Sequence, residues 1–143
     1  MHKQLKTHYY FAVVPAVGLF LAIGLAKTAH LIHTGQFAVP SFVHSMVFVL
    51  SAATAIAGPL FVRTMFAHFK RLEHQVSEHD FLAFQRRLLW VSQVTPYLAV
   101  TAFLCDFPKF YATAIVLMAL YAVYYYFPSQ RRIDFDRKIF RVR

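Results

Sequence analysis

Long apolar runs separated by short polar segments are the feature that most limits how this chain can fold. Four such runs are present, and they cover residues 11–32, 42–62, 88–105 and 110–127. Because an α-helix rises about 1.5 Å per residue, about 20 apolar residues cross the roughly 30 Å hydrocarbon layer of a bilayer. We therefore predict an all-α integral membrane protein, a four-transmembrane-helix bundle built as two antiparallel hairpins.

The composition supports the same fold class. Hydrophobic residues make up 59% of the chain, and only 15% of the residues are charged. A soluble domain of this length would bury only about 70% of the surface that its unfolded chain exposes, so much of this apolar surface would face water. The length of 143 residues leaves room for one transmembrane domain, 1–143.

A cleaved signal peptide is the alternative interpretation of the first run, because a short basic segment precedes it. The apolar part of the run is longer than the roughly 7–15 residues of a signal peptide. Lys27 also occupies a position in the sequence Ala26-Lys27-Thr28-Ala29 where cleavage requires a small residue. We therefore expect a retained helix.

The polar segment 63–87 separates the two hairpins. Apolar residues continue beyond Val62 at three- and four-residue spacing, which predicts that the second helix extends out of the membrane. Ser77 followed by Asp80 resembles a helix N-cap, so a new helix is expected to begin there. The segment is predicted to be an ordered helical hairpin tip that protrudes into the cytoplasm.

Small residues and prolines mark two places inside the runs. The stretch 51–58 is rich in Ala, Ser, Thr and Gly, and small residues let helix backbones approach closely in lipid. Pro59 and Pro96 are expected to kink their helices, because proline removes a backbone hydrogen bond.

The distribution of Lys and Arg predicts the orientation. Two of these residues precede the first run, five lie in 63–87 and six lie in the tail 128–143, whereas Lys27 and Lys109 are the remaining two. Since Lys and Arg are retained on the cytoplasmic side, both termini and the segment 63–87 should be cytoplasmic, in a multi-pass protein of the cell (inner) membrane. The net charge of +9 then suits anionic lipid headgroups on that side, and we expect no nucleic acid as a partner.

Three histidines form the first candidate site. His30 and His33 lie three residues apart on one helix face, and His44 lies one turn into the next helix. If the two helices face one another, neutral imidazoles at these positions could bind haem b or a transition metal. The alternative is that the histidines are interfacial and form hydrogen bonds to turn carbonyls or headgroups.

A second candidate site lies within the third run. Gln93, Thr95 and Thr101 could form a polar intramembrane site together with the carbonyl that Pro96 leaves unpaired. The alternative is hydrogen bonding between helices that holds the bundle together. Asp106, which follows Cys105, is interpreted as part of a tight turn.

The sequence indicates an architecture more strongly than an activity. No run contains a buried acid–base pair, and no glycine-rich phosphate loop or Ser-His-Asp arrangement occurs. Enzymatic activity is therefore uncertain and not favoured. The favoured hypothesis is a non-catalytic subunit or accessory protein of a membrane complex or homo-oligomer. The alternatives are a haem- or metal-binding redox component and a small oligomeric transporter or channel.

Overall fold

The structure, a computed structural model, describes residues 2–32, 39–71 and 76–141. Over these residues the fold is all-α, as predicted, with 84% of them in helices and no β-strand. The elements are α1 (His2–Thr28), α2 (Ser41–Ala52), the π-helical η1 (Ala53–Ala57), α3 (Gly58–Phe69), α4 (Glu78–Leu104), α5 (Lys109–Tyr125) and α6 (Gln130–Ile139).

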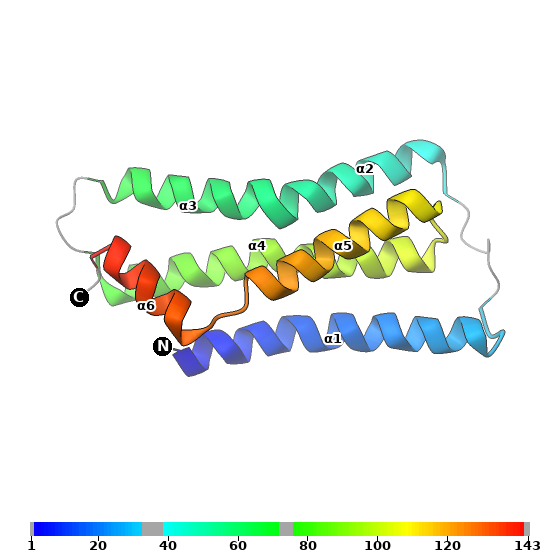
Figure 1. Cartoon of the computed structure of the whole chain (residues 1–143), viewed down its shortest axis with the longest axis horizontal. Coiled ribbons are helices and arrows are strands. Elements are labelled where there is room, and N and C mark those ends of the chain that lie inside the picture. Colours follow the sequence, from blue (N-terminus) through cyan, green and yellow to red (C-terminus); the bar gives the residue numbers. More distant parts are fainter. Residues whose placement is uncertain (1, 33–38, 72–75, 142–143) are drawn as a thin grey trace.

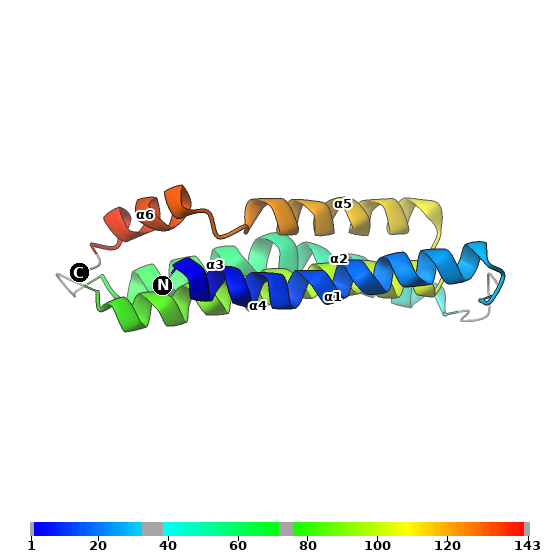
Figure 2. The same cartoon turned by 90° about the horizontal axis from the view of Figure 1, so that it is seen from below.

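Helix α4 lies between α1 and the stretch α2–η1–α3 in Figure 1, and Figure 2 shows α5 and α6 on one side of these helices. Helix α1 packs on one side of α4, and the continuous stretch α2–η1–α3 packs on the other side. Helix α5 lies against both α4 and α2. The expectation of a first hairpin whose two helices face one another is therefore corrected, because α4 lies between α1 and α2. Apolar residues cover most of α1, so the sequence did not indicate which helix would pack against it.

Helix α1 ends at Thr28, four residues before the predicted end of the first span. His30 takes a left-handed conformation, with φ 56°. The Leu31 amide donates to the Ala26 carbonyl (2.9 Å), and the His30 amide donates to the Lys27 carbonyl (3.2 Å). This is the Schellman pattern of helix termination, in which a left-handed residue usually supplied by glycine closes the last turn.

The turn between α4 and α5 ends α4 in the same way. Asp106 has φ 50°, and the amide of Phe107 donates to the carbonyl of Ala102 (3.1 Å). The tight turn expected at Asp106 is confirmed.

Helix α4 begins where the N-cap pattern predicted. The Ser77 hydroxyl oxygen accepts a hydrogen bond from the Asp80 amide (3.1 Å). The acidic Glu78 and Asp80 lie in the first turn, where their negative charges interact favourably with the positive end of the helix dipole. The tail 128–143 was predicted only as a basic segment, whereas it contains α6. Ser129 caps α6 by accepting from the Arg132 amide (3.4 Å).

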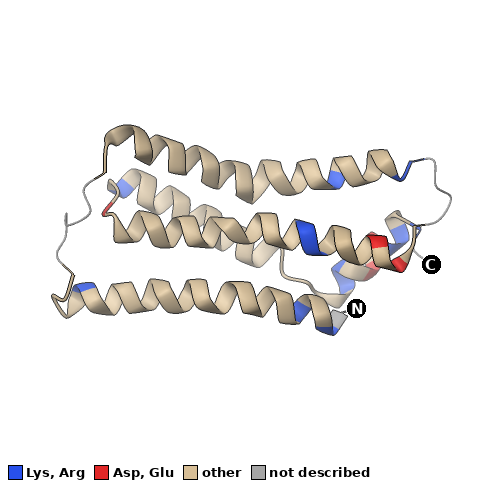
Figure 3. Cartoon of the chain, turned by 180° about the vertical axis from the view of Figure 1, so that it is seen from behind, with Lys and Arg blue, Asp and Glu red and all other residues tan. Residues whose placement is uncertain are grey.

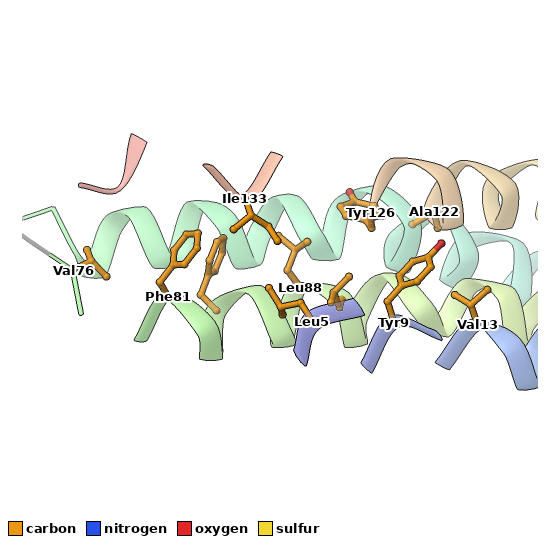
Figure 4. Close-up of a cluster of buried hydrophobic side chains, with 12 residues drawn as sticks. Leu5, Tyr9, Val13, Val76, Phe81, Leu88, Ala122, Tyr126 and Ile133 are labelled. Atoms are coloured by element: carbon orange, nitrogen blue, oxygen red, sulfur yellow. The ribbon is translucent and has the colours of Figure 1, made fainter. Parts of the chain in front are cut away.

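Two apolar cores follow one another along the bundle. The first gathers side chains from α1, α4, α5 and α6 near the end where α1 begins (Figure 4). Its buried members are Leu5, Tyr9, Val13, Ala55, Val76, Phe81, Phe84, Leu88, Leu89, Ala122, Tyr126 and Ile133. The second core lies towards the α4–α5 turn and contains Ala99, Ala102, Phe107, Ile115 and Ala119.

Two helical stretches, Lys3–Thr28 and Ser41–Phe69, are long and apolar enough to cross a membrane. The pair formed by α5 and α6 is a third candidate, although it bends by 75° between the two helices. Lys and Arg residues gather at the end where α1 begins and α6 ends, as Figure 3 shows in blue. The described molecule is therefore polarised along its long axis, with an apolar middle.

Candidate functional site

The three histidines do not form a common site in the described structure. His30 closes the end of α1 through its left-handed backbone. His33 lies outside the described residues. His44 lies on α2, on the opposite side of α4 from α1, and its ring lies edge-on to Phe107 at a centroid distance of 4.5 Å. His44 therefore packs on the α4–α5 turn.

Within the described residues, no group of three or more His, Cys, Asp or Glu side chains is placed to hold a metal ion. The geometry also lacks facing helices that would present His30 and His44 to one haem, since α4 separates the two helices. Haem or metal binding by His30, His33 and His44 stays a prediction that no contact among the described residues supports.

The residues of the second candidate site, Gln93, Thr95 and Thr101, do not share a common set of contacts. The Thr95 hydroxyl is hydrogen-bonded to the Thr54 hydroxyl of η1 (2.9 Å), and Thr95 is fully buried. Thr101 is exposed and donates to the Tyr97 carbonyl of its own helix (3.0 Å). Thr95 thus fits the interhelical hydrogen-bonding interpretation, and Thr101 does not join it.

Gln93 is the exceptional member of this group. It is only 2% exposed, and neither its Nε2 nor its Oε1 has a hydrogen-bond partner in the described part of the chain. An amide buried without partners costs about 1–3 kcal/mol. It lies three residues before Pro96, whose missing N–H leaves the Ser92 carbonyl without its usual helical donor. The Gln93 amide and the Ser92 carbonyl therefore lie at the same level of α4.

The small-residue stretch packs closely on α4 of the same chain. Ser51 and Ala55 are completely buried. A Cβ added to Gly58 would lie 2.6 Å from the Cγ1 atom of Val91, which no real contact allows. The π-helical turn η1 directly precedes Gly58 and widens the helix where Thr54 reaches Thr95.

A buried ionic group formed by three helices was not predicted from the sequence. Asp136 of α6 accepts a hydrogen bond from Arg63 Nη2 of α3 (2.6 Å) and another from Gln85 Nε2 of α4 (2.9 Å). The Asp136 side chain is 5% exposed and that of Arg63 is 32% exposed. The available signal was the Ser129 cap followed by the apolar position Ile133, which together indicate an amphipathic helix in the tail.

A second ion pair joins helices at the opposite end of the bundle. Lys27 of α1 pairs with Asp106 of the α4–α5 turn, and its ammonium also donates to the Phe103 carbonyl (2.5 Å). The same ammonium lies 4.7 Å from the centroid of the Phe103 ring. Lys27, which the sequence placed inside the first apolar run, is therefore compensated by α4.

A third ion pair connects α3 with the start of α4. Lys70 Nζ lies 2.8 Å from Asp80 Oδ2. The hydrogen bond from Lys70, reinforced by its positive charge and by the Ser77 cap, holds the pKa of the Asp80 carboxyl below its ordinary value. This pair closes one end of a groove between α3 and α4.

No protein-family model, curated protein or solved structure matches this chain.

Proposed function

We propose that this chain is a four-span, multi-pass protein of the cell (inner) membrane that acts as a non-catalytic subunit or accessory protein of a membrane complex or homo-oligomer. Both termini and the segment 63–87 lie in the cytoplasm in this proposal. The four spans cover residues 11–32, 42–62, 88–105 and 110–127, which lie mostly within α1, α2–η1–α3, α4 and α5, and α6 lies on the cytoplasmic side.

The observation that carries the proposal is the polarity of the molecule. Thirteen of the 15 Lys and Arg residues belong to the N-terminal segment, the segment 63–87 and the tail. Between the two polar ends, large apolar side chains face outward on α1, α2 and α5, among them Phe11, Leu25, Phe42, Val49, Phe110 and Leu120. Such a surface is stable in lipid or against another apolar surface, and it is not stable in water.

The interior polar groups support a non-catalytic role. The Thr54–Thr95 hydrogen bond, the Asp136 group and the Lys27–Asp106 pair each join different helices. Each is therefore used to fix the arrangement of the bundle. In membranes, hydrogen bonds between helices contribute about 0.6–2 kcal/mol apiece.

Site-directed labelling tests the topology. Cys105 is replaced by serine, and single cysteines are introduced at Ser129 and at Lys109 in separate variants. In intact inverted inner-membrane vesicles, a membrane-impermeant maleimide should label Ser129→Cys and leave Lys109→Cys unlabelled. Right-side-out vesicles should give the opposite result. Labelling of both positions from one side would contradict the proposed orientation.

Cross-linking in the native membrane tests the subunit role. A photo-crosslinking residue at Phe11 or Leu25, both exposed on α1, should give discrete adducts with a protein partner or a second copy. The matched control is Ala16, which is buried and should give no intermolecular adduct. Adducts with lipid alone at every exposed position of α1, α2 and α5 would contradict the subunit role.

Transport through an oligomer is the second candidate function, and the buried Gln93 amide without partners favours it. The two roles predict opposite outcomes for Gln93→Leu. If the amide serves no ligand, its replacement by a similar-sized apolar side chain should raise the free energy of unfolding by about 1–2 kcal/mol, measured by denaturation in mixed micelles. If the amide serves a pathway, the substitution abolishes solute flux in proteoliposomes.

A further inference from the structure

A groove of about 350 Å³ lies between α3 and α4 at the basic end of the bundle. Its walls include Phe61, Met65, Phe66 and Phe69 of α3 and Phe84 and Arg87 of α4. The volume is within the range of about 300–1,000 Å³ that is typical of small-molecule sites. The groove is mainly apolar, with four phenylalanines among its lining residues, and has charged groups at defined positions.

Polarity changes along the groove. The Lys70–Asp80 ion pair lies at one end, and Phe61 lies nine positions before Lys70 on α3. This spacing corresponds to about 13 Å along the helix axis. Phe61 is strongly exposed at the opposite end, towards the apolar middle of the molecule. Arg87 lies seven positions after Asp80 on α4, near the Phe61 end, so a ligand bound at this end would meet Arg87 and then the apolar middle of the molecule beyond Phe61.

Arg87 supplies the uncompensated positive charge. The Lys70 ammonium is paired with Asp80, whereas Arg87 is exposed and forms no ion pair or hydrogen bond within the described residues. A guanidinium group presents several donors in a planar fork that matches a phosphate. The groove consequently attracts an anion, and phosphate is the anion that Arg87 fits best.

Trp90 indicates the level of the groove relative to the membrane surface. It lies one helical turn from Arg87 towards the middle of α4, and it is 54% exposed. Exposed tryptophan is enriched at the level of the lipid headgroups. If α3 and α4 span the membrane as proposed above, Arg87 lies at the headgroup layer and Phe61 faces the start of the acyl chains.

We propose that this groove binds one anionic phospholipid of the cytoplasmic leaflet. Its phosphate lies on Arg87, its headgroup points towards the Lys70–Asp80 pair, and an acyl chain runs past Phe61 into the bilayer. This inference rests on the membrane placement under the proposed function. The positive charge of Arg87 and the apolar surface beyond Phe61 favour a lipid over a helix of another protein, which would need an apolar groove along its whole length.

The single tryptophan of the chain makes the site directly observable. The full chain is reconstituted into vesicles of phosphatidylcholine and phosphatidylglycerol, with brominated acyl chains on one lipid or the other. Bromine quenches tryptophan fluorescence only at short range, so quenching of Trp90 reports the lipid beside Arg87. Brominated phosphatidylglycerol should be enriched at Trp90 by about fivefold over its mole fraction, the value expected for one basic side chain at an anionic surface.

Two adjacent arginines provide a matched pair of variants. Arg87→Gln should remove the enrichment, and Arg87→Lys should keep part of it because the charge remains while the planar fork is lost. Arg86→Gln changes the net charge equally, but Arg86 lines a different groove beside Gln4 and His8 of α1, so this variant should keep the enrichment. Size-exclusion chromatography verifies that all variants stay monodisperse.

Each contrary outcome has a distinct meaning. Quenching by both lipids in proportion to their mole fractions would overturn the lipid site and leave the membrane placement intact. Absence of quenching by either lipid would overturn the membrane placement itself. Enrichment that survives in Arg87→Gln would overturn the role of Arg87. Loss of enrichment on adding inorganic phosphate at constant ionic strength would overturn the lipid assignment in favour of a free anion.

Discussion

His30 has a backbone conformation that is unfavourable for its own side chain. A left-handed conformation costs a non-glycine residue about 1–2 kcal/mol, and His30 holds φ 56° at the end of α1. We predict that His30→Gly raises the free energy of unfolding by about 1 kcal/mol, because glycine removes this cost while adding some unfolded-state entropy. Denaturation in mixed micelles, followed by circular dichroism, measures the difference.

Asp106→Gly is the informative comparison for His30→Gly. It relieves the same backbone conformation at the end of α4, but it also removes the ion pair with Lys27. Asp106→Gly should therefore raise the free energy of unfolding by less than His30→Gly does, or should lower it. A His30→Gly variant that is less stable than the native chain and loses a bound chromophore would instead support the haem hypothesis.

The Asp136 carboxylate connects three helices through two hydrogen bonds, from Arg63 and Gln85. Asp136→Asn should lower the free energy of unfolding by about 2 kcal/mol, because the partly buried Arg63 loses its counter-charge. Asp134→Asn is a matched control on the same helix, since Asp134 is exposed. A double-mutant cycle with Arg63→Gln isolates the pair, and a coupling energy near zero would contradict the proposed interaction.

At this scale, interactions between residues close in the sequence could be predicted, and interactions between distant residues could not. The Ser77 cap and the Asp106 turn were predicted because each is a local interaction within a few residues. The partners of Lys27 and Asp136 were not predicted, since they lie 79 and 73 positions away and depend on how the helices pack.

The packing of α3 on α4 depends on the absence of a side chain at Gly58. Gly58→Ala should lower the free energy of unfolding by about 1–3 kcal/mol, because its Cβ would overlap Val91 and push the two helices apart. Gly18→Ala in α1 is the matched control, since a Cβ there meets no atom within 4 Å. That variant should be neutral or more stable by about 0.5–1 kcal/mol. Equal effects of both substitutions on thermal unfolding would contradict the close approach at Gly58.

Helix existence was easier to predict than helix partners. The apolar runs and their periodicity indicated the long helices, because both are properties of a continuous stretch of sequence. Helix α6 was missed since its composition is mostly charged, and only Ile133 and Asp136 are buried. The predicted packing partner of α1 was wrong because the exposed and buried faces of α1 are similarly apolar. No apolar stripe therefore marked the face that packs on α4.

For the whole molecule, the Lys70–Asp80 pair predicts a pH dependence of stability. The pKa of Asp80 is lowered in the folded state by its hydrogen bond from Lys70. A carboxyl group whose pKa is lower in the folded state stabilises the fold at pH values above its unfolded-state pKa. This contribution is lost as the pH falls through the folded-state pKa. The native chain should therefore be more stable than Asp80→Asn at neutral pH, and the difference should shrink in the acid range.

Thermal unfolding of both proteins between pH 7 and pH 3 measures this difference. The nearby His79 has its Nδ1 3.9 Å from Asp80 Oδ1, so His79→Gln is included in both backgrounds to isolate the Lys70–Asp80 pair. A difference between the native chain and Asp80→Asn that is constant over this range would contradict the assigned role of the carboxylate.

The arrangement of α1 has a consequence for the order in which the protein is made. Its main packing partner is α4, yet α2, η1 and α3 are synthesised between them. During synthesis α1 is therefore made before its main packing partner, and if the chain inserts into a membrane as proposed, α1 enters the bilayer before residues 78–104 have left the ribosome. Under the same proposal, the Lys27 ammonium has no Asp106 to pair with until the turn after α4 has also been made, so its charge must be accommodated by the insertion machinery or by lipid headgroups during this interval.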